Sequence, residues 1–384
     1  MRHDHAVGPL RVLRDRVPVE RHDRPKVDDR DADAVLLGLL GRHERALDER
    51  APREDDQVGS FAPATAGLFS ASETGVLAYR VGIGGNQMQL TWFDPKGTNL
   101  GTVGDKGAYQ NPAVSPDATR VAVTQLDRQS ANSDIWVLDV ARGNSIKVTF
   151  KPGRNDFPVW SPDGKSLMFS NNSAGHLDLY VKSADGSGEE RLVLKTDQDK
   201  RPTSWSKDGR FLLYQSTDPT TLADIWVLPN PAGPAGNAKP IPYLRTPLAE
   251  GLALFSPDSR WVAYTAAETG NTDVFVRPFY PDRISESAAG GKWLVSKGGA
   301  SNARWRGDGK ELYYSDTTLQ VTAVDVRTDK TFDPGIPRRL FTLPLLSALD
   351  VTADGKRLVV PVPEGANAPS PFEVVTNWQA VLTK

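Results

Sequence analysis

"FPVWSPDGKSLMFSN", residues 157–171, predicts a strand, a tight turn and a second strand. The central Ser-Pro-Asp-Gly suits a type I turn, because Ser favours its first position, Pro presets φ at the second and Gly fits the fourth. After the turn, apolar residues alternate with period two, which indicates a strand with one buried face. The stretch therefore predicts a hairpin of two antiparallel strands.

The same phrase returns along the chain at a nearly constant spacing. Copies begin at residues 114, 160, 205, 255, 305 and 351, as in "WSKDGRFLLY" and "FSPDSRWVAY", and their turn aspartates are 45 to 50 residues apart. A degenerate copy, "FSASETGVLAY", begins at residue 69. Further strand patterns follow each hairpin, as in "DLYVKSA" (178–184) and "ERLVLKT" (190–196). Seven copies at this period are typical of propeller blades.

The repeats predict an all-β fold, a seven-bladed β-propeller of four-stranded antiparallel blades over residues 58–384. One blade cannot bury both of its faces, so neighbouring blades must stack, and a closed ring leaves none unpaired. Residues 1–57 are charged and contain no aromatic residue, which predicts a mostly disordered leader that packs little against the ring. We expect residues 57–66 to pair with a strand at 372–378 and so to close the ring.

Composition excludes several classes of function. The net charge of −2 gives no general affinity for nucleic acid, and no apolar run is long enough for a transmembrane segment. There is no cysteine, and four of the five histidines lie within residues 1–57, so we expect no metal site and no cofactor. The first residues lack the apolar core of a secretory signal, which predicts a cytoplasmic protein as the sequence is written.

The repeat "[W/F]-S-P-D-G-[K/R]…D-[I/L]-[W/Y]-V" resembles that of TolB-like β-propellers. The closing "FEVVTNWQAVL" (372–382) is similar to the end of propellers that follow the kinase domain in bacterial receptor-like serine/threonine kinases. The resemblance covers about 85% of the chain and rests on turn and core residues. It implies the propeller fold and a binding platform, in relatives that are commonly extracytoplasmic. Kinase signatures are absent from the sequence.

The topology of a propeller predicts where a site would lie. Each Ser-Pro-Asp-Gly turn follows an innermost strand on one face, so the residues before that strand rim the central funnel on the other face. Concave, polar surfaces of this kind bind ligands. The candidate binding residues are Gln110, Asn111, Asn155, Lys200, Arg201, Ser301, Asn302 and Arg304, and the candidate carboxylates are Asp156 and Glu250.

Two functions are consistent with these residues. The first is a monomeric binding or scaffold propeller whose partner is a protein or a small carbohydrate. The second is a glycoside hydrolase with Asp156 and Glu250 as catalytic residues, since glycosidases need only two carboxylates. A peptidase or a metalloenzyme is not expected, because no G-x-S-x-G nucleophile motif occurs and His176 would have to act alone as base. The sequence does not identify the ligand.

Overall fold

The computed structural model describes residues 69–71, 76–80, 87–127, 130, 132–234, 239–287, 289–329, 331–343, 348–363 and 372–376. The chain divides into two compact units, residues 1–82 with 369–384 and residues 83–368. The second unit contains the six repeats that carry a turn aspartate. The predicted leader, residues 1–57, lies outside the described residues. No helix among the described residues is long and apolar enough to cross a membrane.

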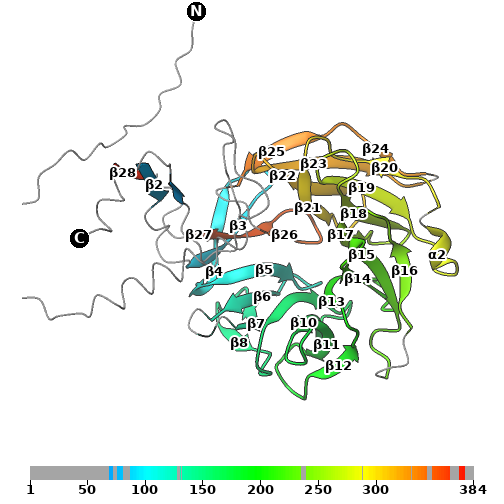
Figure 1. The fold of residues 1–384 in the computed structure, drawn as a ribbon, viewed down its shortest axis with the longest axis horizontal. Helices are drawn as coiled ribbons and strands as arrows, with labels where there is room; N and C mark the ends of the chain where they lie inside the picture. Colours follow the sequence, from blue (N-terminus) through cyan, green and yellow to red (C-terminus); the bar gives the residue numbers. More distant parts are fainter. Residues whose placement is uncertain are drawn as a thin grey trace, which may run out of the picture. The chain divides into compact units, whose positions relative to one another are not determined.

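The second unit is a β-propeller (Figure 1). Its first blade contains β5 (Tyr109–Val114), β6 (Arg120–Leu126), β7 (Ser133–Asp139) and β8 (Ser145–Lys147). The second contains β9 (Asn155–Trp160), β10 (Ser166–Asn171), β11 (Asp178–Ser183) and β12 (Arg191–Leu194). The third contains β13 (Asp199–Trp205), β14 (Phe211–Asp218), β15 (Leu222–Pro229) and β16 (Ile241–Leu244).

The remaining blades follow the same antiparallel order. The fourth contains β17 (Glu250–Phe255), β18 (Trp261–Ala266), β19 (Asp273–Pro278) and β20 (Trp293–Leu294), with the short helix α2 (Ile284–Ser287) before β20. The fifth contains β21 (Ala300–Trp305), β22 (Glu311–Asp316), β23 (Gln320–Arg327), β24 (Asp333–Pro334) and β25 (Arg338–Thr342). The sixth contains β26 (Asp350–Val351), β27 (Leu358–Pro363), β3 (Met88–Phe93) and β4 (Asn99–Gly107).

The described strands therefore confirm the β-propeller but correct the predicted number of blades from seven to six. The last repeat supplies only the two inner strands of its blade, β26 and β27. Strands β3 and β4, which precede the first repeat turn, supply the two outer ones. Counting the segment before the first turn as a separate blade gave one blade too many, because each blade needs one turn aspartate and the chain has six.

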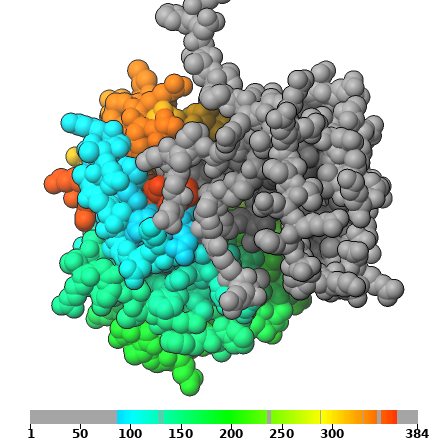
Figure 2. Space-filling view, turned by 90° about the vertical axis from the view of Figure 1, so that its left-hand side faces the viewer, coloured from blue at the N-terminus to red at the C-terminus, as the bar shows by residue number. Residues whose placement is uncertain are grey.

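The predicted seam also differs from the observed one. Ring closure joins β27 to β3, with Val360 opposite Thr91. In the space-filling view, the cyan surface of β3 and β4 lies between the orange fifth blade and the teal first blade (Figure 2). The degenerate copy forms β1 (Phe69–Ala71) and β2 (Val76–Arg80) in the first unit, where β2 pairs with β28 (Phe372–Thr376). Residues 57–66 lie outside the described residues.

Apolar clusters hold successive blades together. Between the first and second blades, buried Ile135 packs in one cluster with Leu167. At the seam, Trp92 and Val359 of the sixth blade pack with Val121 of the first. Each of the six junctions between described blades has such a cluster. Because burial of one large apolar side chain contributes about 1.5–3 kcal/mol, each of these junctions stabilises the ring.

The repeated turn explains why its aspartate recurs. In the second blade, the Ser161 hydroxyl donates to Asp163 Oδ1 at 2.6 Å, and the same oxygen accepts the amide of Lys165 at 3.1 Å. The amide of Gly164 donates to the carbonyl of Ser161 at 2.9 Å. The bond from Ser161 is the largest cause that lowers the pKa of Asp163. The turn aspartates are therefore structural, and they leave the chemistry of the site to other residues.

Candidate functional site

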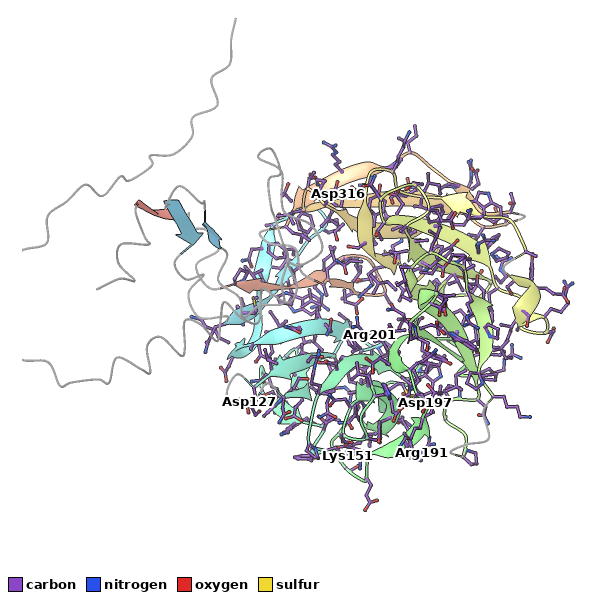
Figure 3. The ribbon with its side chains drawn as sticks, viewed as in Figure 1. Asp127, Lys151, Arg191, Asp197, Arg201 and Asp316 are labelled. Atoms are coloured by element: carbon purple, nitrogen blue, oxygen red, sulfur yellow. The ribbon has the colours of Figure 1, made fainter. Side chains whose placement is uncertain are left out.

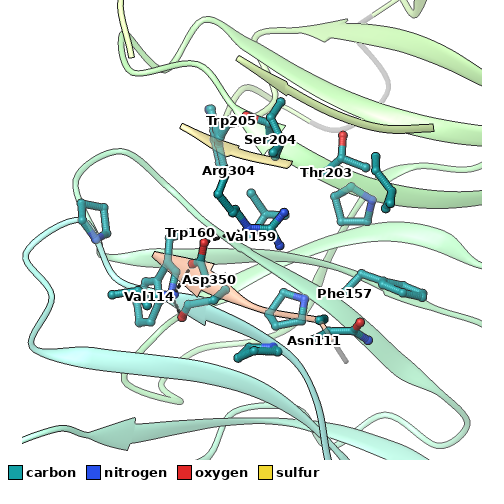
Figure 4. Close-up of a pocket in the computed structure, with 18 of the residues that line it drawn as sticks. Asn111, Val114, Phe157, Val159, Trp160, Thr203, Ser204, Trp205, Arg304 and Asp350 are labelled. Atoms are coloured by element: carbon teal, nitrogen blue, oxygen red, sulfur yellow. Dashed lines mark hydrogen bonds and ion pairs between the residues drawn. The ribbon is translucent and has the colours of Figure 1, made fainter. Parts of the chain in front are cut away.

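The innermost strands surround a central cavity of about 490 Å³, called the channel here (Figure 4). The residues that line it stand at equivalent positions in the six sequence repeats. One ring of lining residues stands six positions before the turn aspartates: Asn111, Phe157, Pro202, Leu252, Asn302 and Ala348. A second stands four positions before them: Ala113, Val159, Ser204, Leu254, Arg304 and Asp350. A third stands one position before them: Pro116, Pro162, Lys207, Pro257, Gly307 and Ala353.

Four of the six residues in the first of these rings stand at β-bulges. In β5, β9, β17 and β21, two residues of the innermost strand oppose one residue of the second strand. The first residue of each bulge has a left-handed backbone, with φ of 48° at Asn111, 59° at Phe157, 48° at Leu252 and 53° at Asn302. Bulges redirect side chains, and bulky residues with positive φ are uncommon. The recurrence of this strained geometry around the channel is typical of a functional site.

A single ion pair interrupts the second ring, whose other members are small, apolar or hydroxyl side chains. Arg304 Nε donates to Asp350 Oδ1 at 2.9 Å, and both side chains are largely buried (Figure 4). The other carboxylate oxygen of Asp350 accepts the backbone amide of Val114 at 2.7 Å. Arg304 also donates through Nη1 to the carbonyl of Ala303 at 2.8 Å. These bonds fix a guanidinium at the wall of the channel.

Two further cations line the channel. Arg201 is exposed, its guanidinium lies 4.7 Å from the ring centre of Phe157, and Figure 3 shows it near the middle of the propeller. Lys207 is exposed and belongs to the third ring of lining residues. Among the described residues that line the channel, Asp350 is the one carboxylate. The described lining therefore carries three cationic side chains and one anionic side chain.

The structure divides the predicted site residues into three groups. Asn111, Arg201, Asn302 and Arg304 line the channel. Gln110 is exposed and Ser301 is half-buried, but neither belongs to the lining. Four residues within the first two positions of innermost strands are instead buried in the junctions between blades: Asn155, Asp156, Lys200 and Glu250.

Both candidate carboxylates lie outside the channel lining. Asp156 is 1% exposed and accepts hydrogen bonds from the Ser133 hydroxyl at 2.9 Å and from Arg154 Nη2 at 2.6 Å. Glu250 is also 1% exposed, and the hydroxyl of Thr246 donates to its Oε1. Its Oε2 has no hydrogen-bond partner among the described residues. Burial is the main cause that raises the pKa of Glu250, and the nearby Asp224 adds to it.

The buried residues at the strand starts connect neighbouring blades. Lys200 Nζ lies 3.0 Å from Asp178 Oδ1 and donates to the Thr196 hydroxyl at 2.8 Å. Asn155 Nδ2 similarly donates to Asp134 Oδ1 at 3.3 Å. Both acceptors belong to the third strand of the preceding blade. Their role in the structure is to satisfy buried polar groups between blades, as such groups require.

Sequence reasoning missed Asp350, Phe157 and Leu252 as residues of the site. A signal for them was present, because each stands at the same distance before its turn aspartate as Arg304 or Asn302 does before Asp308. The sequence predicts the rim of the funnel just before each innermost strand. This prediction selects residues at the start of the strand and misses several that lie further along it. The described residues contain no group of three or more His, Cys, Asp or Glu side chains that could hold a metal.

Comparisons with known proteins agree with this architecture. Residues 66–230 match the family model of the TolB beta propeller domain. The Tol-Pal system protein TolB of Anaeromyxobacter dehalogenans (strain 2CP-C) is 30% identical over 173 residues, 44% of this chain and 36% of that protein. The uncharacterized peptidase YuxL of Bacillus subtilis (strain 168) is 32% identical over 108 residues, 27% of this chain and 16% of that protein. The matches thus span about a third or less of these curated relatives.

A solved structure from Agrobacterium tumefaciens, described provisionally as TolB, shares the fold. It has a TM-score of 0.57 at 17% identity and covers 72% of this chain and 98% of its own. None of the relatives described here is a kinase, so the resemblance to kinase-associated propellers stays a prediction. The ring of this protein is a β-propeller, and over residues 66–230 the chain is similar to the TolB beta propeller domain.

Proposed function

We propose that this protein is a binding propeller and that its channel holds a segment of a partner protein. The observation that carries the proposal is the convergence of lining residues from all six blades on one cavity of about 490 Å³. Four of those residues are held at positive φ by bulges. Sites of this size, mostly apolar with a few placed polar groups, are typical of ligand binding. The TolB-like fold is consistent with a protein partner.

The glycoside hydrolase alternative receives no support from the geometry. Hydrolysis requires two carboxyl groups that face a shared substrate site. Asp156 and Glu250 are each 1% exposed and neither lines the channel. Asp350, the carboxylate that does line it, is bonded to Arg304 and to the amide of Val114. A small carbohydrate that is bound but not hydrolysed is the alternative ligand, and the binding test below includes it.

The test is selection of displayed random peptides on the immobilised full chain. The blocking variant is Ala348→Trp, because Ala348 is a half-buried member of the first ring of the channel. The matched control is Ala141→Trp, which adds the same side chain at an exposed turn after β7. We expect selected peptides to bind the wild type and Ala141→Trp and to lose binding to Ala348→Trp. Both variants should first be shown to unfold at the temperature of the wild type.

Two results would count against the proposal. If the selected peptides bind Ala348→Trp as well as they bind the control, their site lies elsewhere on the molecule. If the wild type selects no peptide while an array of neutral and acidic oligosaccharides yields a ligand that Ala348→Trp loses, the channel binds carbohydrate instead. If neither probe binds, the channel is not a binding site.

A further inference from the structure

We infer that the segment bound in the channel is an acidic peptide, whose carboxylate is held by Arg304. This inference rests on the proposed function and specifies its ligand. Its first support is the contrast between the channel and the chain as a whole. The chain has a net charge of −2, whereas the described channel lining combines Arg201, Lys207 and Arg304 with Asp350 alone. A concave site with an excess of one sign of charge attracts partners of the other sign.

The three cations are spread along the channel. Arg201 stands seven positions before its turn aspartate, and Arg304 stands four before its own. Lys207 directly precedes its turn aspartate. Because each innermost strand runs along the channel toward its turn, these positions correspond to successive levels of the wall. A single small anion would use one of them. An extended chain with several carboxylates could use all three.

Arg304 is already held in a geometry suited to a carboxylate. Asp350 Oδ1 accepts from Nε, and the carbonyl of Ala303 accepts from Nη1. Among the described residues Nη2 has no hydrogen-bond partner, and the side chain of Arg304 is 23% exposed. A guanidinium that is fixed in advance loses little freedom when it binds, and bonds between charged groups are the stronger ones.

Asp350 does not neutralise the positive charge of the channel lining. Its two oxygens are occupied, one by Arg304 and one by the amide of Val114 at 2.7 Å. It therefore anchors the guanidinium and lowers the net charge of the lining by one. Its removal would leave three cations facing the ligand. Loss of Asp350 should therefore strengthen the binding of an acidic peptide, whereas loss of Arg304 should weaken it.

The rest of the lining favours a peptide over a nucleic acid. Apolar side chains alternate with the polar ones, among them Phe157, Val159, Leu252 and Leu254. A nucleic acid would require a continuous cationic track with exposed stacking platforms, and the channel has three separated cations. Phe157 is covered by Arg201 at 4.7 Å. An acidic peptide with apolar residues between its carboxylates matches both features.

The experiment uses three labelled hexapeptides and fluorescence anisotropy with the full chain. Their sequences are (Asp-Leu)₃, (Asn-Leu)₃ and (Lys-Leu)₃, which differ in charge at similar size. We expect (Asp-Leu)₃ to bind about tenfold or more tightly than (Asn-Leu)₃, with affinity that falls as salt rises. (Lys-Leu)₃ should not bind.

Two variants and a control test the role of Arg304. Arg304→Met should weaken binding of (Asp-Leu)₃ about tenfold, since it removes a charge-assisted bond. Asp350→Asn removes the negative charge of the described lining, while the amide oxygen of Asn can still accept from Arg304 Nε. It should therefore strengthen binding of the same peptide, whereas a damaged fold would weaken it. Arg283→Met, at an exposed residue that directly precedes α2 and does not line the channel, should bind as the wild type does.

Failure of this inference can be told apart from failure of the proposed function. If peptides selected on the wild type are neutral or basic and Ala348→Trp abolishes their binding, the channel binds peptides but not acidic ones. The inference also fails if Arg304→Met and Arg283→Met bind (Asp-Leu)₃ equally, or if Asp350→Asn weakens it. It fails as well if an oligonucleotide binds in the channel and (Asp-Leu)₃ does not.

Discussion

Individual residues with positive φ show how the repeat tolerates substitution. The last residue of the turn is glycine in four copies, with φ of 67° at Gly164 and 77° at Gly209. Ala118 and Ser259 occupy the same position in two other copies, with φ of 57° and 56°. The turn geometry is therefore set by the hydrogen bonds of the repeat and not by glycine. A side chain at this position costs about 1 kcal/mol per residue.

Ala118→Gly should accordingly raise the free energy of unfolding by a few tenths to about 1 kcal/mol, because relief of the strained φ is partly offset by a more flexible unfolded chain. The reverse substitution is Gly209→Ala. No atom lies within 4 Å of a Cβ built at Gly209, so it tests φ without a steric clash, and it should lower the free energy of unfolding by about 1 kcal/mol. Urea denaturation measures both. Equal stability of all three proteins would contradict the strain.

Glu250 predicts a pH dependence of stability. Burial raises its pKa above the ordinary value of 4.5, and burial also raises the pKa of Asp224 above 3.8. Each has one buried oxygen without a hydrogen-bond partner among the described residues. Arg245, 3.4 Å from Asp224, offsets part of this effect. Carboxyls with raised pKa hold their protons more tightly in the folded state, so the free energy that they contribute is greatest at low pH.

This contribution should be complete below the unfolded pKa values, near pH 4, and should be lost as pH rises through the raised values of the folded protein. Turn aspartates such as Asp163 have lowered pKa values and act in the opposite direction. The measurement is therefore the difference in melting temperature between wild type and Glu250→Gln from pH 4 to 7. We expect Glu250→Gln to gain stability relative to wild type as pH rises. A difference independent of pH would disprove the assignment.

At the scale of elements, polar pairs join the third strand of one blade to the start of the next. β7 meets β9 through Asp134 and Asn155 at 3.3 Å, and β11 meets β13 through Asp178 and Lys200 at 3.0 Å. Both members of the second pair are fully buried. Burial is the main cause that lowers the pKa of Lys200, and the bond to Asp178 opposes it. Removal of one member would leave an uncompensated charge inside the junction.

Lys200→Met should therefore lower the free energy of unfolding by about 3–5 kcal/mol. The double variant Lys200→Met/Asp178→Leu should recover most of that loss, because apolar residues can replace a buried ion pair with little change in stability. Chemical denaturation of the wild type, both single variants and the double variant gives the coupling energy. A double variant no more stable than Lys200→Met would show that packing, and not charge, dominates this junction.

At the scale of the whole molecule, the ring is closed by segments that are far apart in the sequence. β27 and β3 pair over six residues, from Leu358 opposite Phe93 to Pro363 opposite Met88. The hairpin of β3 and β4 completes a blade that begins more than 240 residues later. Loss of the seam would expose the apolar cluster that Trp92 and Val359 share with the first blade.

The register of the seam can be tested with an engineered disulfide. Thr91 and Val360 are direct cross-strand partners, and the chain contains no cysteine. Thr91→Cys/Val360→Cys should form one intramolecular disulfide under oxidising conditions, seen as faster migration on a non-reducing gel. In the chain-entropy model a loop of this length adds about 5–6 kcal/mol to the free energy of unfolding, and strain in the native state lowers that figure. Single-cysteine variants are the control. Purely intermolecular cross-links in the double variant would contradict this closure.

The sequence by itself determined the β-propeller and the positions of its turns. Ser-Pro-Asp-Gly turns and strands with alternating apolar residues are local signals. The hydrogen bonds of Asp163 stay within its own turn, so the turn can be predicted from a few neighbouring residues. Asn111, Arg201, Asn302 and Arg304 were also predicted, because they stand close to the expected start of an innermost strand.

Only the tertiary structure decided the number of blades and the composition of the site. No local sequence pattern predicts that β27 pairs with β3, because pairing between distant segments depends on the closure of the ring. The burial of Asp156 and Glu250 likewise depends on how neighbouring blades pack over the starts of their strands. The bulges that turn Phe157 and Leu252 into the channel arise from a mismatch between two paired strands, so a single strand pattern could not reveal them.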